Sequence, residues 1–443
     1  MSQRLSDHFT RYRPIFCNRT KRFFDRAEHY TQGIVQSQFR NIERISEDLD
    51  AQYHQMQHFI TESNWDERAA IDQVSKEVSS ILPKRKLTGL IIDESGWVKK
   101  GDKSVGVGSQ YCGNVGKIAN SQVAVFGCLS NGDFASLVDA RLYLPQDWCN
   151  DPDRCAEAGI PQGNRAFKTK LELALEIIHQ QVVNRVSFDF IGADGYYGND
   201  ASLARNIDQM GYIYMMDIHS DQKIFTLEPE LYHPERKGAK NGETLKKLVA
   251  TTPQTTVSKY MESLQAGDWE MIHVRNTTKG KLKGKYHFAR VFVWDKSLNL
   301  IEPRLLVIRK TVSGKNKVEI KYSFTNAPLE QYTRKALAYM QAQRFFIEHS
   351  IKESKQILGL DEFQTRKWLA WQHQVALNFI VSSFLLKEKL RCLDDLPLLS
   401  ARDVKEWFVF KLYKNMTEDQ FFDRMYNRHL LRQRDINNSY LRI

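Results

Sequence analysis

The sequence predicts a mixed α/β fold, in which a core of alternating strands and helices is interrupted by a β-rich insertion and flanked by helical regions. Three patterns lead to this prediction. Residues 83–219 alternate short apolar runs with amphipathic helical segments. Residues 220–328 instead contain two segments with the alternation and Gly-bearing turns of β-hairpins. Residues 1–82 and 329–443 repeat apolar side chains at helical spacing.

The N-terminal region, residues 1–82, is expected to be helical throughout. Asn64 precedes the segment WDERAAIDQVSKEVSSIL, and an Asn N-cap followed by an acidic first turn marks the start of a helix. Pro83 and the basic run after it end the region. Two uses remain open for these helices: a ligand-binding head, or a brace for the core that follows.

The first part of the core, residues 83–219, begins with the apolar run LTGLIID. Two strands should follow, joined at Asn131 and Gly132, because this dipeptide favours a tight hairpin turn. AFKTKLELALEIIHQQVVNR then has the pattern of an amphipathic helix, and VSFDFIGAD that of a buried strand. A further helix and strand, NDASLARNIDQMG and YIYMMDI, complete an alternation that indicates a mixed sheet.

The segment 220–328 breaks this alternation, and its two predicted hairpins have basic turns, KGKLKGK and RKTVSGKNK. An all-β segment inside an α/β fold indicates an insertion. Residues 329–392 are then expected to return to the core with two long helical segments, and residues 393–443 to form a basic helical tail.

The charge balance favours a polyanionic partner. Lys and Arg number 64 against 53 Asp and Glu, for a formal charge of +11 and a pI near 9.2. Each Lys or Arg placed on a phosphate releases counterions, although charge alone does not separate a nucleic acid from an anionic membrane. The apolar run 375–386 is too short to span a bilayer, and we expect a buried core helix there.

The cysteines and the N-terminus point to the cytoplasm. Six widely scattered cysteines are typical of reduced, intracellular thiols, and the first residues lack the apolar segment of a secretory signal. Cys149 and Cys155 form the one close pair, but their spacing is wrong for a zinc knuckle. No zinc site is therefore predicted.

Two acids stand at the ends of buried apolar strands: Asp93 in LIIDES and Asp194 in FIGADGYYG. A carboxylate at such a place costs desolvation free energy unless something pairs with it, and nearby glycines allow a ligand close approach. Taken singly, each is better interpreted as an N-cap or turn residue after a strand.

A third acid lies in the helical segment RFFIEHSIKESK. Arg344, Glu348 and Lys355 are separated by four and seven residues, so they should project from one face of a helix. Phe345, Phe346, Ile347 and Ile351 surround this stripe, which favours metal and phosphate chemistry over a solvated ion-pair stripe. The solvated stripe remains the alternative.

These residues carry a resemblance. The chain resembles DDE transposases of the insertion-sequence 4 superfamily, and most closely the insertion-sequence 701 group. The likeness is strongest in LIIDESGWVKKGDKSVGVGSQYCGNVGKIANSQVAVF, FIGADGYYGND and QRFFIEHSIKESKQILGLDEFQTRKW. The superfamily has a Tyr-x2-Arg-x3-Glu-x6-Lys signature, which Arg344, Glu348 and Lys355 match, whereas Gln341 replaces the tyrosine.

The resemblance implies a fold and a site. Asp93, Asp194 and Glu348 would form the catalytic triad of an RNase H-like core, and the segment 220–328 falls where the superfamily has its β-strand insertion. Three carboxylates suit Mg²⁺, for which Mn²⁺ can substitute, and two such ions can support in-line phosphoryl displacement. Arg344 and Lys355 would bind phosphates, and Gln341 would keep only the hydrogen-bonding part of the tyrosine's DNA contact.

Further DNA contacts are expected around the first acid and in the insertion. The Gly-rich loop after Asp93 carries four lysines, and we expect it to contact DNA rather than move freely in solvent. It does not form a phosphate-binding loop, so no nucleotide cofactor is predicted. Related transposases stack a Trp of the insertion on a flipped base; Trp294 is the candidate, with core packing as the alternative. The loop lysines are Lys99, Lys100, Lys103 and Lys117.

The function implied is a DNA transposase that cuts element ends and transfers strands into target DNA. Its partner would be double-stranded DNA, and we expect a homodimer in a DNA-bound synaptic complex, associated with the nucleoid of a prokaryotic cell. The N-terminal helices would then be a head for DNA ends. Two alternatives remain: an RNase H-like nuclease that does not join strands, and a domesticated DNA-binding protein without activity.

Overall fold

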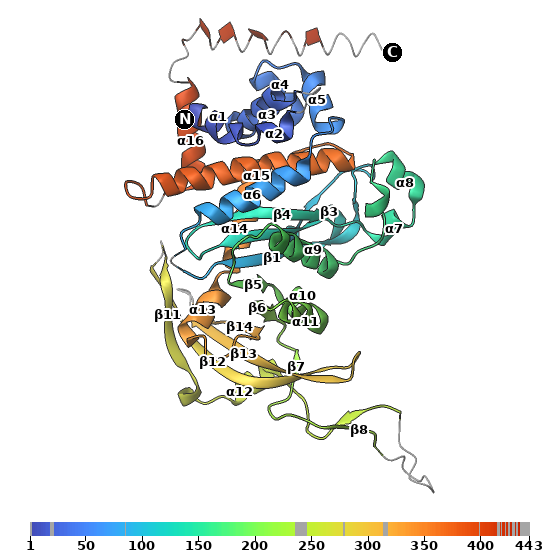
Figure 1. The fold of residues 1–443 in the computed structure, drawn as a ribbon, viewed down its shortest axis with the longest axis vertical. Helices are drawn as coiled ribbons and strands as arrows, with labels where there is room; N and C mark the ends of the chain where they lie inside the picture. Colours follow the sequence, from blue (N-terminus) through green and yellow to red (C-terminus); the bar gives the residue numbers. More distant parts are fainter. Residues whose placement is uncertain are drawn as a thin grey trace.

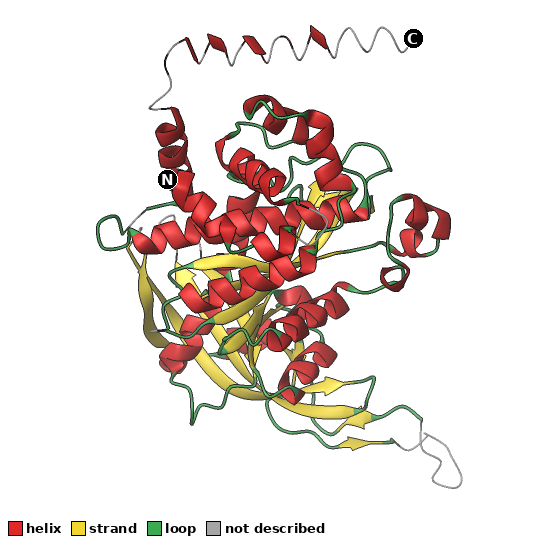
Figure 2. Ribbon diagram, turned by 45° about the horizontal axis from the view of Figure 1, so that its top comes forward, coloured by secondary structure: helices red, strands yellow, loops and turns green. Residues whose placement is uncertain are grey.

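The computed structural model describes residues 2–17, 22–84, 86–234, 246–277, 280–312, 318–397, 399–413 and a few positions between 417 and 434. It is built around one large mixed sheet, with helices on its faces and a helical cluster at one end (Figures 1 and 2). The mixed α/β fold predicted from the sequence is confirmed. Within the predicted basic tail, 393–443, residues 435–443 and several positions between 398 and 432 lie outside the described residues.

The helical cluster is formed by the first 81 residues. Aromatic side chains fill its interior, where the Phe16 ring packs at a tilt against Trp65 with a ring-centroid distance of 4.7 Å. The last helix begins after Asp66, whose side chain accepts a hydrogen bond from the Ala69 amide, so the N-cap is Asp66 and not Asn64. The helices are α1 (Ser2–Thr10), α2 (Arg13–Phe16), α3 (Phe24–Gln36), α4 (Ile42–Asp48), α5 (Tyr53–Thr61) and α6 (Glu67–Ile81).

The core of the sheet has the strand order β4-β3-β1-β5-β6. β1 is antiparallel to β3 and parallel to β5, and β5 is parallel to β6. This arrangement is RNase H-like, as the resemblance implies. The predicted hairpin turn is present, because Gly132 adopts a φ of 80° between β3 and β4. The strands are β1 (Gly89–Val98), β2 (Gly108–Cys112), β3 (Lys117–Ser130), β4 (Ala135–Leu142), β5 (Phe190–Ala193) and β6 (Ile213–Ile218).

Helices cover both faces of this core (Figure 1). Neighbouring residues of a strand point to opposite faces. Cys128 contacts Ser350 of α14, whereas Gly127 approaches Ile177 of α9, so these two helices lie on opposite faces. A capping box at Thr169 and Glu172 starts α9. The helices between β4 and β6 are α7 (Gln146–Cys149), α8 (Pro152–Glu157), α9 (Lys170–Val183), α10 (Gly195–Gly198) and α11 (Ala201–Gln209).

The β-rich segment continues the same sheet. β14 pairs antiparallel with β6, and β13, β12 and β11 follow outward. Both predicted hairpins are present, although parts of their turns, 278–279 and 313–317, lie outside the described residues. The elements are β7 (Lys223–Ile224), β8 (Leu231–Tyr232), β9 (Val249–Ala250), β10 (Thr255–Thr256), α12 (Val257–Ser263), β11 (Glu270–Thr277), β12 (Gly280–Asp295), β13 (Leu300–Val312) and β14 (Val318–Thr325).

The C-terminal part is helical, but its first helical segment is broken. It forms two helices that meet at Gln343 and Arg344, where the sequence predicted one continuous helix. The apolar run 375–386 is buried within α15, as predicted, and packs beside α3, α5 and α6. No helix in the described part of the chain could cross a membrane. The helices are α13 (Arg334–Ala342), α14 (Phe345–Gln356), α15 (Trp368–Arg391) and α16 (Ala401–Tyr413).

Candidate active site

The sheet brings the two strand-end aspartates together. Ile92 of β1 is the register partner of Ala193 of β5, so Asp93 and Asp194, which follow them, are adjacent at the same end of two parallel strands. Asp194 also caps α10, because its Oδ1 accepts a hydrogen bond from the Tyr196 amide at 3.0 Å. The geometry is therefore compatible with Asp194 as a helix cap and also as a residue of the site.

The third acid reaches the same place from α14, through Arg344. Arg344 Nη2 lies 2.6 Å from Glu348 Oε1, and Nη1 lies 3.5 Å from Asp93 Oδ2. The Glu348 side chain is 49% exposed, so it is not enclosed by its aromatic neighbours as the sequence suggested. It therefore extends into a solvent-filled space beside the aspartates.

Burial and mutual repulsion perturb the acids. Desolvation, together with the nearby Asp194 carboxylate, raises the pKa of Asp93 to about 8, although Arg344 opposes the shift. Desolvation and the Glu94 carboxylate likewise raise the pKa of Asp194. Carboxylates held this close resist full ionisation unless positive charge is added, which is the electrostatic environment of a cation or phosphate site.

These groups line a cleft of about 700 Å³ between β1 and α14. The β2–β3 turn forms another wall, where Asn114 donates a hydrogen bond to the Gly96 carbonyl at 2.9 Å. The lining includes Asp93, Glu94, Ser95, Gly96, Tyr111, Gly113, Asn114, Asp194, Glu348, Lys352, Lys355 and Asp361. The three candidate catalytic acids therefore share one cleft.

Two further acids belong to this site, and the sequence interpretation missed both. Glu94 lines the cleft and pairs with Lys170 at 2.9 Å, while its Oε2 is buried without a hydrogen-bond partner. Asp217 of β6 lies 3.1 Å from Arg344 Nε. Asp217 ends the apolar run YIYMMDI just as Asp93 and Asp194 end theirs, so the same strand-end signal would have found it.

Gly198 allows α10, the helix that Asp194 caps, to pack closely on Asp217 of β6. A Cβ at Gly198 would overlap the Asp217 carbonyl oxygen, so only glycine lets α10 pack directly on β6. Because Asp194 caps α10, this contact joins the two strand ends.

Lys355 lines the same cleft as Glu348, but its side chain is turned toward β1. It is 7% exposed and donates hydrogen bonds to Ser95 Oγ at 2.9 Å and to the Gly96 carbonyl at 2.8 Å. Burial lowers the pKa of its ammonium group. Through these hydrogen bonds Lys355 links α14 to β1. Lys352, one turn after Glu348, is instead the exposed lysine of this cleft.

Gln341 faces the interior. It is 4% exposed and donates a hydrogen bond to Ser323 Oγ at 2.9 Å. The contact to DNA that the resemblance suggested for this position has no counterpart in such a buried side chain. Its place at the end of α13, before the break at Arg344, separates it from the helix that carries Glu348.

The loop lysines divide into two kinds. Lys99 donates to the Phe363 carbonyl at 2.8 Å, and burial lowers its pKa to about 8. Lys103 pairs with Glu157 at 3.7 Å. Lys100 and Lys117 are exposed, as a contact to a DNA backbone requires.

Trp294 lies at the other end of the insertion from the carboxylates. Asp217 is the register partner of Ser323, which aligns through Val307 with Phe288 of β12. Trp294 lies six residues further along β12, roughly 20 Å toward the opposite end of the sheet. Trp269, the other Trp near the insertion, is partly buried against His287.

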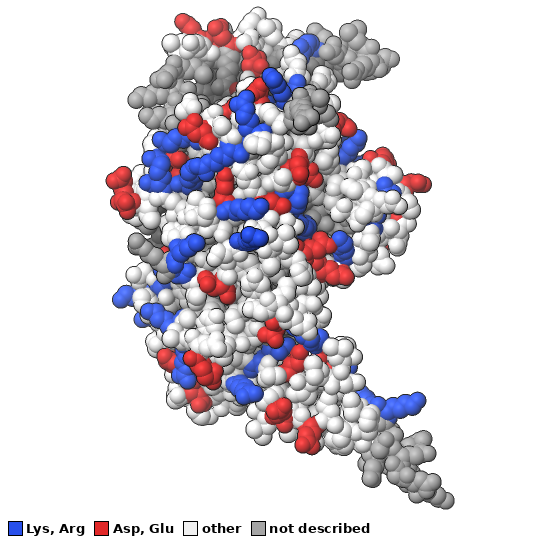
Figure 3. Space-filling model, viewed as in Figure 1, with Lys and Arg blue, Asp and Glu red and all other residues white. Residues whose placement is uncertain are grey.

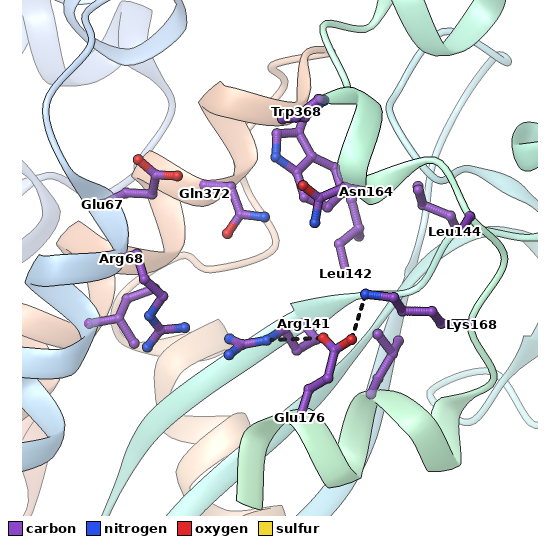
Figure 4. Close-up of a pocket in the computed structure, with 14 residues that line it drawn as sticks. Glu67, Arg68, Arg141, Leu142, Leu144, Asn164, Lys168, Glu176, Trp368 and Gln372 are labelled. Atoms are coloured by element: carbon purple, nitrogen blue, oxygen red, sulfur yellow. Dashed lines mark hydrogen bonds and ion pairs between the residues drawn. The ribbon is translucent and has the colours of Figure 1, made fainter. Parts of the chain in front are cut away.

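A second cavity, of about 320 Å³, lies between α6, β4, α9 and the start of α15 (Figure 4). Its charged groups mostly pair with one another, since Glu176 contacts Arg141 at 3.7 Å and Lys168 at 2.5 Å. None of the strand-end acids lines this cavity. The cleft beside β1 is therefore the candidate active site.

The face of the molecule drawn in Figure 3 has no single basic patch. Figure 3 shows Lys and Arg interspersed with Asp and Glu, most densely over the C-terminal half of α15. Within the described residues, no three His, Cys, Asp or Glu side chains converge closely enough, as placed, to hold a metal ion. The guanidinium of Arg344 lies among the carboxylates instead.

Comparison with known proteins identifies a relative among transposases. Over 172 residues the chain is 28% identical to a probable transposase for insertion sequence element IS701 from Microchaete diplosiphon. That match covers 38% of this chain and 41% of the relative. The predicted likeness to this group is thus found independently.

Solved structures give weaker likenesses. A piggyBac transposase in a synaptic complex with hairpin DNA matches 96% of this chain and 82% of its own, at 10% identity and a TM-score of 0.38. The NurA nuclease from Sulfolobus solfataricus matches 62% of this chain and 80% of its own, at 9% identity and a TM-score of 0.23.

The family comparison covers more than half of the sequence. The model of the DDE superfamily endonucleases matches residues 5–281, a range that includes Asp93 and Asp194 and ends before Glu348. The strand-end aspartates thus fall within the matched range, and Glu348 joins them through the fold. The chain belongs to the DDE superfamily of endonucleases.

Proposed function

We propose that this protein is a DNA transposase that cuts the ends of an insertion-sequence element and joins them to target DNA. The observation that carries the proposal is the convergence of Asp93, Asp194 and Glu348 on one open cleft. The similarity to a probable insertion-sequence transposase supports it. Both steps of the proposed reaction are phosphoryl displacements at DNA.

The donor set fits a hard divalent cation, Mg²⁺ or Mn²⁺. The acids offer only oxygen ligands. Burial, and then the Asp194 carboxylate, raise the pKa of Asp93, and a bound cation would favour its ionised form. Asp93, Asp194 and Glu348 would hold the ions, which supply nucleophile activation and charge stabilisation at phosphorus. Glu348 must then turn away from Arg344, which its 49% exposure permits.

The chain's own cations would bind the DNA phosphates. Once Glu348 turns, the two Nη groups of Arg344 would face the cleft, where a guanidinium can bind a phosphate in bidentate fashion. Lys352 would present its ammonium group at the same opening. Lys355 would act indirectly, because its hydrogen bond fixes α14 to the strand that carries Asp93.

The DNA would extend from the cleft along the exposed lysines of β12. Lys281, Lys283 and Lys285 alternate on one exposed face of this strand, on the carboxylate side of the sheet. Lys285 lies directly opposite Lys310, and like charges so placed repel unless an anion lies between them. Lys100 and Lys117 would contact the backbone on the other side of the cleft.

The test is incubation of the purified chain with Mg²⁺ and duplex DNA that carries the two ends flanking its own gene. Strand-transfer products in which the 3′ ends are joined to a target plasmid are expected. Cleavage without joining would instead identify a nuclease, and retention of DNA without cutting would identify a binding protein. Glu348→Gln provides the control for a contaminating nuclease, because it removes one carboxylate and keeps the side chain's shape.

The same reaction tests the proposed assembly. Two copies of the chain would hold two element ends in one complex. Light scattering of the DNA-bound protein in Ca²⁺, where we expect binding without cutting, should give a mass of two chains and two duplexes. A complex of one chain with one duplex would contradict the dimer.

A further inference from the structure

Gln341 is an unusual side chain for the interior position it occupies. Its Nε2 donates to Ser323 Oγ at 2.9 Å and points to the Val307 carbonyl at 3.4 Å, while its Oε1 is buried without a hydrogen-bond partner. Leaving a buried amide oxygen without a hydrogen bond is unfavourable, and an apolar side chain at this position would avoid that cost. The part of the Gln341 side chain that this position uses is therefore its NH₂ group, which donates hydrogen bonds.

The orientation of this amide follows from its neighbours. A backbone carbonyl can only accept a hydrogen bond, so the group that faces Val307 must be the NH₂ and not the oxygen. The Ser323 hydroxyl has one proton, which it donates to Asp217 Oδ1 at 2.7 Å. Its oxygen is then free to accept from Gln341, and each donor has one acceptor.

This chain of contacts ends at Arg344. The other oxygen of Asp217, Oδ2, forms an ion pair with Arg344 at 3.1 Å from Nε, although the N–H of this buried nitrogen is not aligned for a hydrogen bond. Asp217, Ser323 and Val307 are register partners across β6, β14 and β13, so the contacts run along one row of the sheet. The row is rigid, because Ser323 is fully buried between two hydrogen-bonded strands.

We propose that Gln341, Ser323 and Asp217 form a positioning relay for Arg344. The relay fixes Asp217, and Asp217 holds the Nε edge of the guanidinium. This leaves Nη1 and Nη2 directed at Asp93 and Glu348. Carboxylates around Arg344 outweigh the effect of its burial and raise its pKa, with Asp217 the largest of them. The importance of this orientation for DNA cutting rests on the proposed function, whereas the relay itself does not.

The relay also explains the departure at Gln341. Gln341 stands at the position of the tyrosine in the DDE signature. Its amide acts through hydrogen bonds in the protein interior. Gln341, Ser323 and Asp217 are thus positioning residues, which reach the cleft only through Arg344.

The first experiment measures the relay without DNA or metal. In ¹⁵N-arginine-labelled protein, the Arg344 Nε–H signal is assigned by its loss in Arg344→Lys, and its exchange with solvent is timed. Ser323→Ala and Gln341→Met should each speed this exchange at least tenfold, whereas Ser323→Thr, which keeps the hydroxyl, should restore slow exchange. The matched control is Ser75→Ala, because Ser75 is an equally buried serine that bonds to Val138, away from the relay.

The outcomes are distinct. Unchanged Arg344 exchange in both Ser323→Ala and Gln341→Met, with folding intact by circular dichroism, overturns the relay. Faster exchange of arginine signals throughout the protein in Ser323→Ala, or equal acceleration in Ser75→Ala, also overturns it, because the effect would then be general loosening.

The second experiment asks whether the relay acts through Arg344 in cutting. Ser323→Ala should lower the single-turnover cleavage rate about tenfold and leave the Kd for end DNA within twofold. In an Arg344→Ala background the same change should have no further effect, since the guanidinium it positions is gone. If the cleavage rate of the double variant falls by the product of the two single-variant losses, that result would contradict the relay. Absence of cutting by the wild-type chain would contradict the proposed function, and the exchange measurement would then decide for or against the relay by itself.

Discussion

Arg344 bridges two of the candidate catalytic carboxylates: its Nη2 is 2.6 Å from Glu348 Oε1, and its Nη1 is 3.5 Å from Asp93 Oδ2. The two acids come from a strand and a helix more than 250 residues apart in the sequence. One guanidinium therefore holds the site together while its other edge contacts Asp217.

Arg344→Ala should destabilise the protein more than Glu348→Ala. Loss of the guanidinium leaves Asp93 and Asp217 largely buried without their cation, at a cost on the order of 1–3 kcal/mol after discounting for partial exposure. Glu348 is half exposed, so its removal should cost less than about 1 kcal/mol. Urea unfolding measures both, and a larger loss for Glu348→Ala would contradict the bridge.

Asp93→Asn should stabilise the metal-free protein at pH 8. The folded-state pKa of Asp93, about 8, lies above its usual value of 3.8, so the native state binds the proton more tightly than the unfolded chain. This carboxyl group therefore contributes stability below pH 4 that is lost as the pH rises toward 8. The asparagine variant lacks that loss.

Thermal unfolding in EDTA should show the difference. At pH 8 the Tm of Asp93→Asn should exceed that of the wild type by about 2–4 °C, which corresponds to about 1 kcal/mol in a large domain. The gap should shrink toward pH 4. A Tm difference that does not vary between pH 4 and 8 would show that Asp93 is ionised throughout.

Asp194→Asn and Glu348→Gln should each reduce DNA cutting by at least about a thousandfold, because either change removes a carboxylate proposed to hold a cation. Binding to end DNA should remain within a few-fold of wild type, since neither residue is a cation. Gel assays of both activities test this, and full cutting by either variant would remove that residue from the proposed triad.

Lys352 and Lys355 should behave oppositely when changed to alanine. Lys352→Ala should weaken DNA binding and reduce the slope of log K against log salt by about one, as loss of one phosphate contact does. Lys355→Ala should leave that slope unchanged and lower the free energy of unfolding by about 1–3 kcal/mol, because two buried hydrogen bonds to β1 are lost. A reduced slope for Lys355→Ala would restore it as a phosphate ligand.

The sequence by itself determined the elements of this fold. Apolar runs that end in an acid predicted β1 and β5, and the Asn131–Gly132 turn predicted the hairpin between β3 and β4. Periodicity predicted α9 and the buried α15. These patterns are local, because strand and helix periods are written in neighbouring residues. Family likeness added the expectation that Asp93, Asp194 and Glu348 act together.

Tertiary structure alone decided which side chains meet. Spacing along an assumed continuous helix placed Gln341, Glu348 and Lys355 on one signature. The break at Arg344 separates Gln341 from α14, and its side chain packs inward against β14. Lys355 stays on α14 with Glu348, but its ammonium group bonds to β1. Asp217 joins the site because parallel pairing places the end of β6 beside the end of β5, whereas Glu94 lines the cleft next to Asp93 on β1. A strand-end acid can be recognised from local sequence, but which of these acids meet depends on register and burial between distant segments.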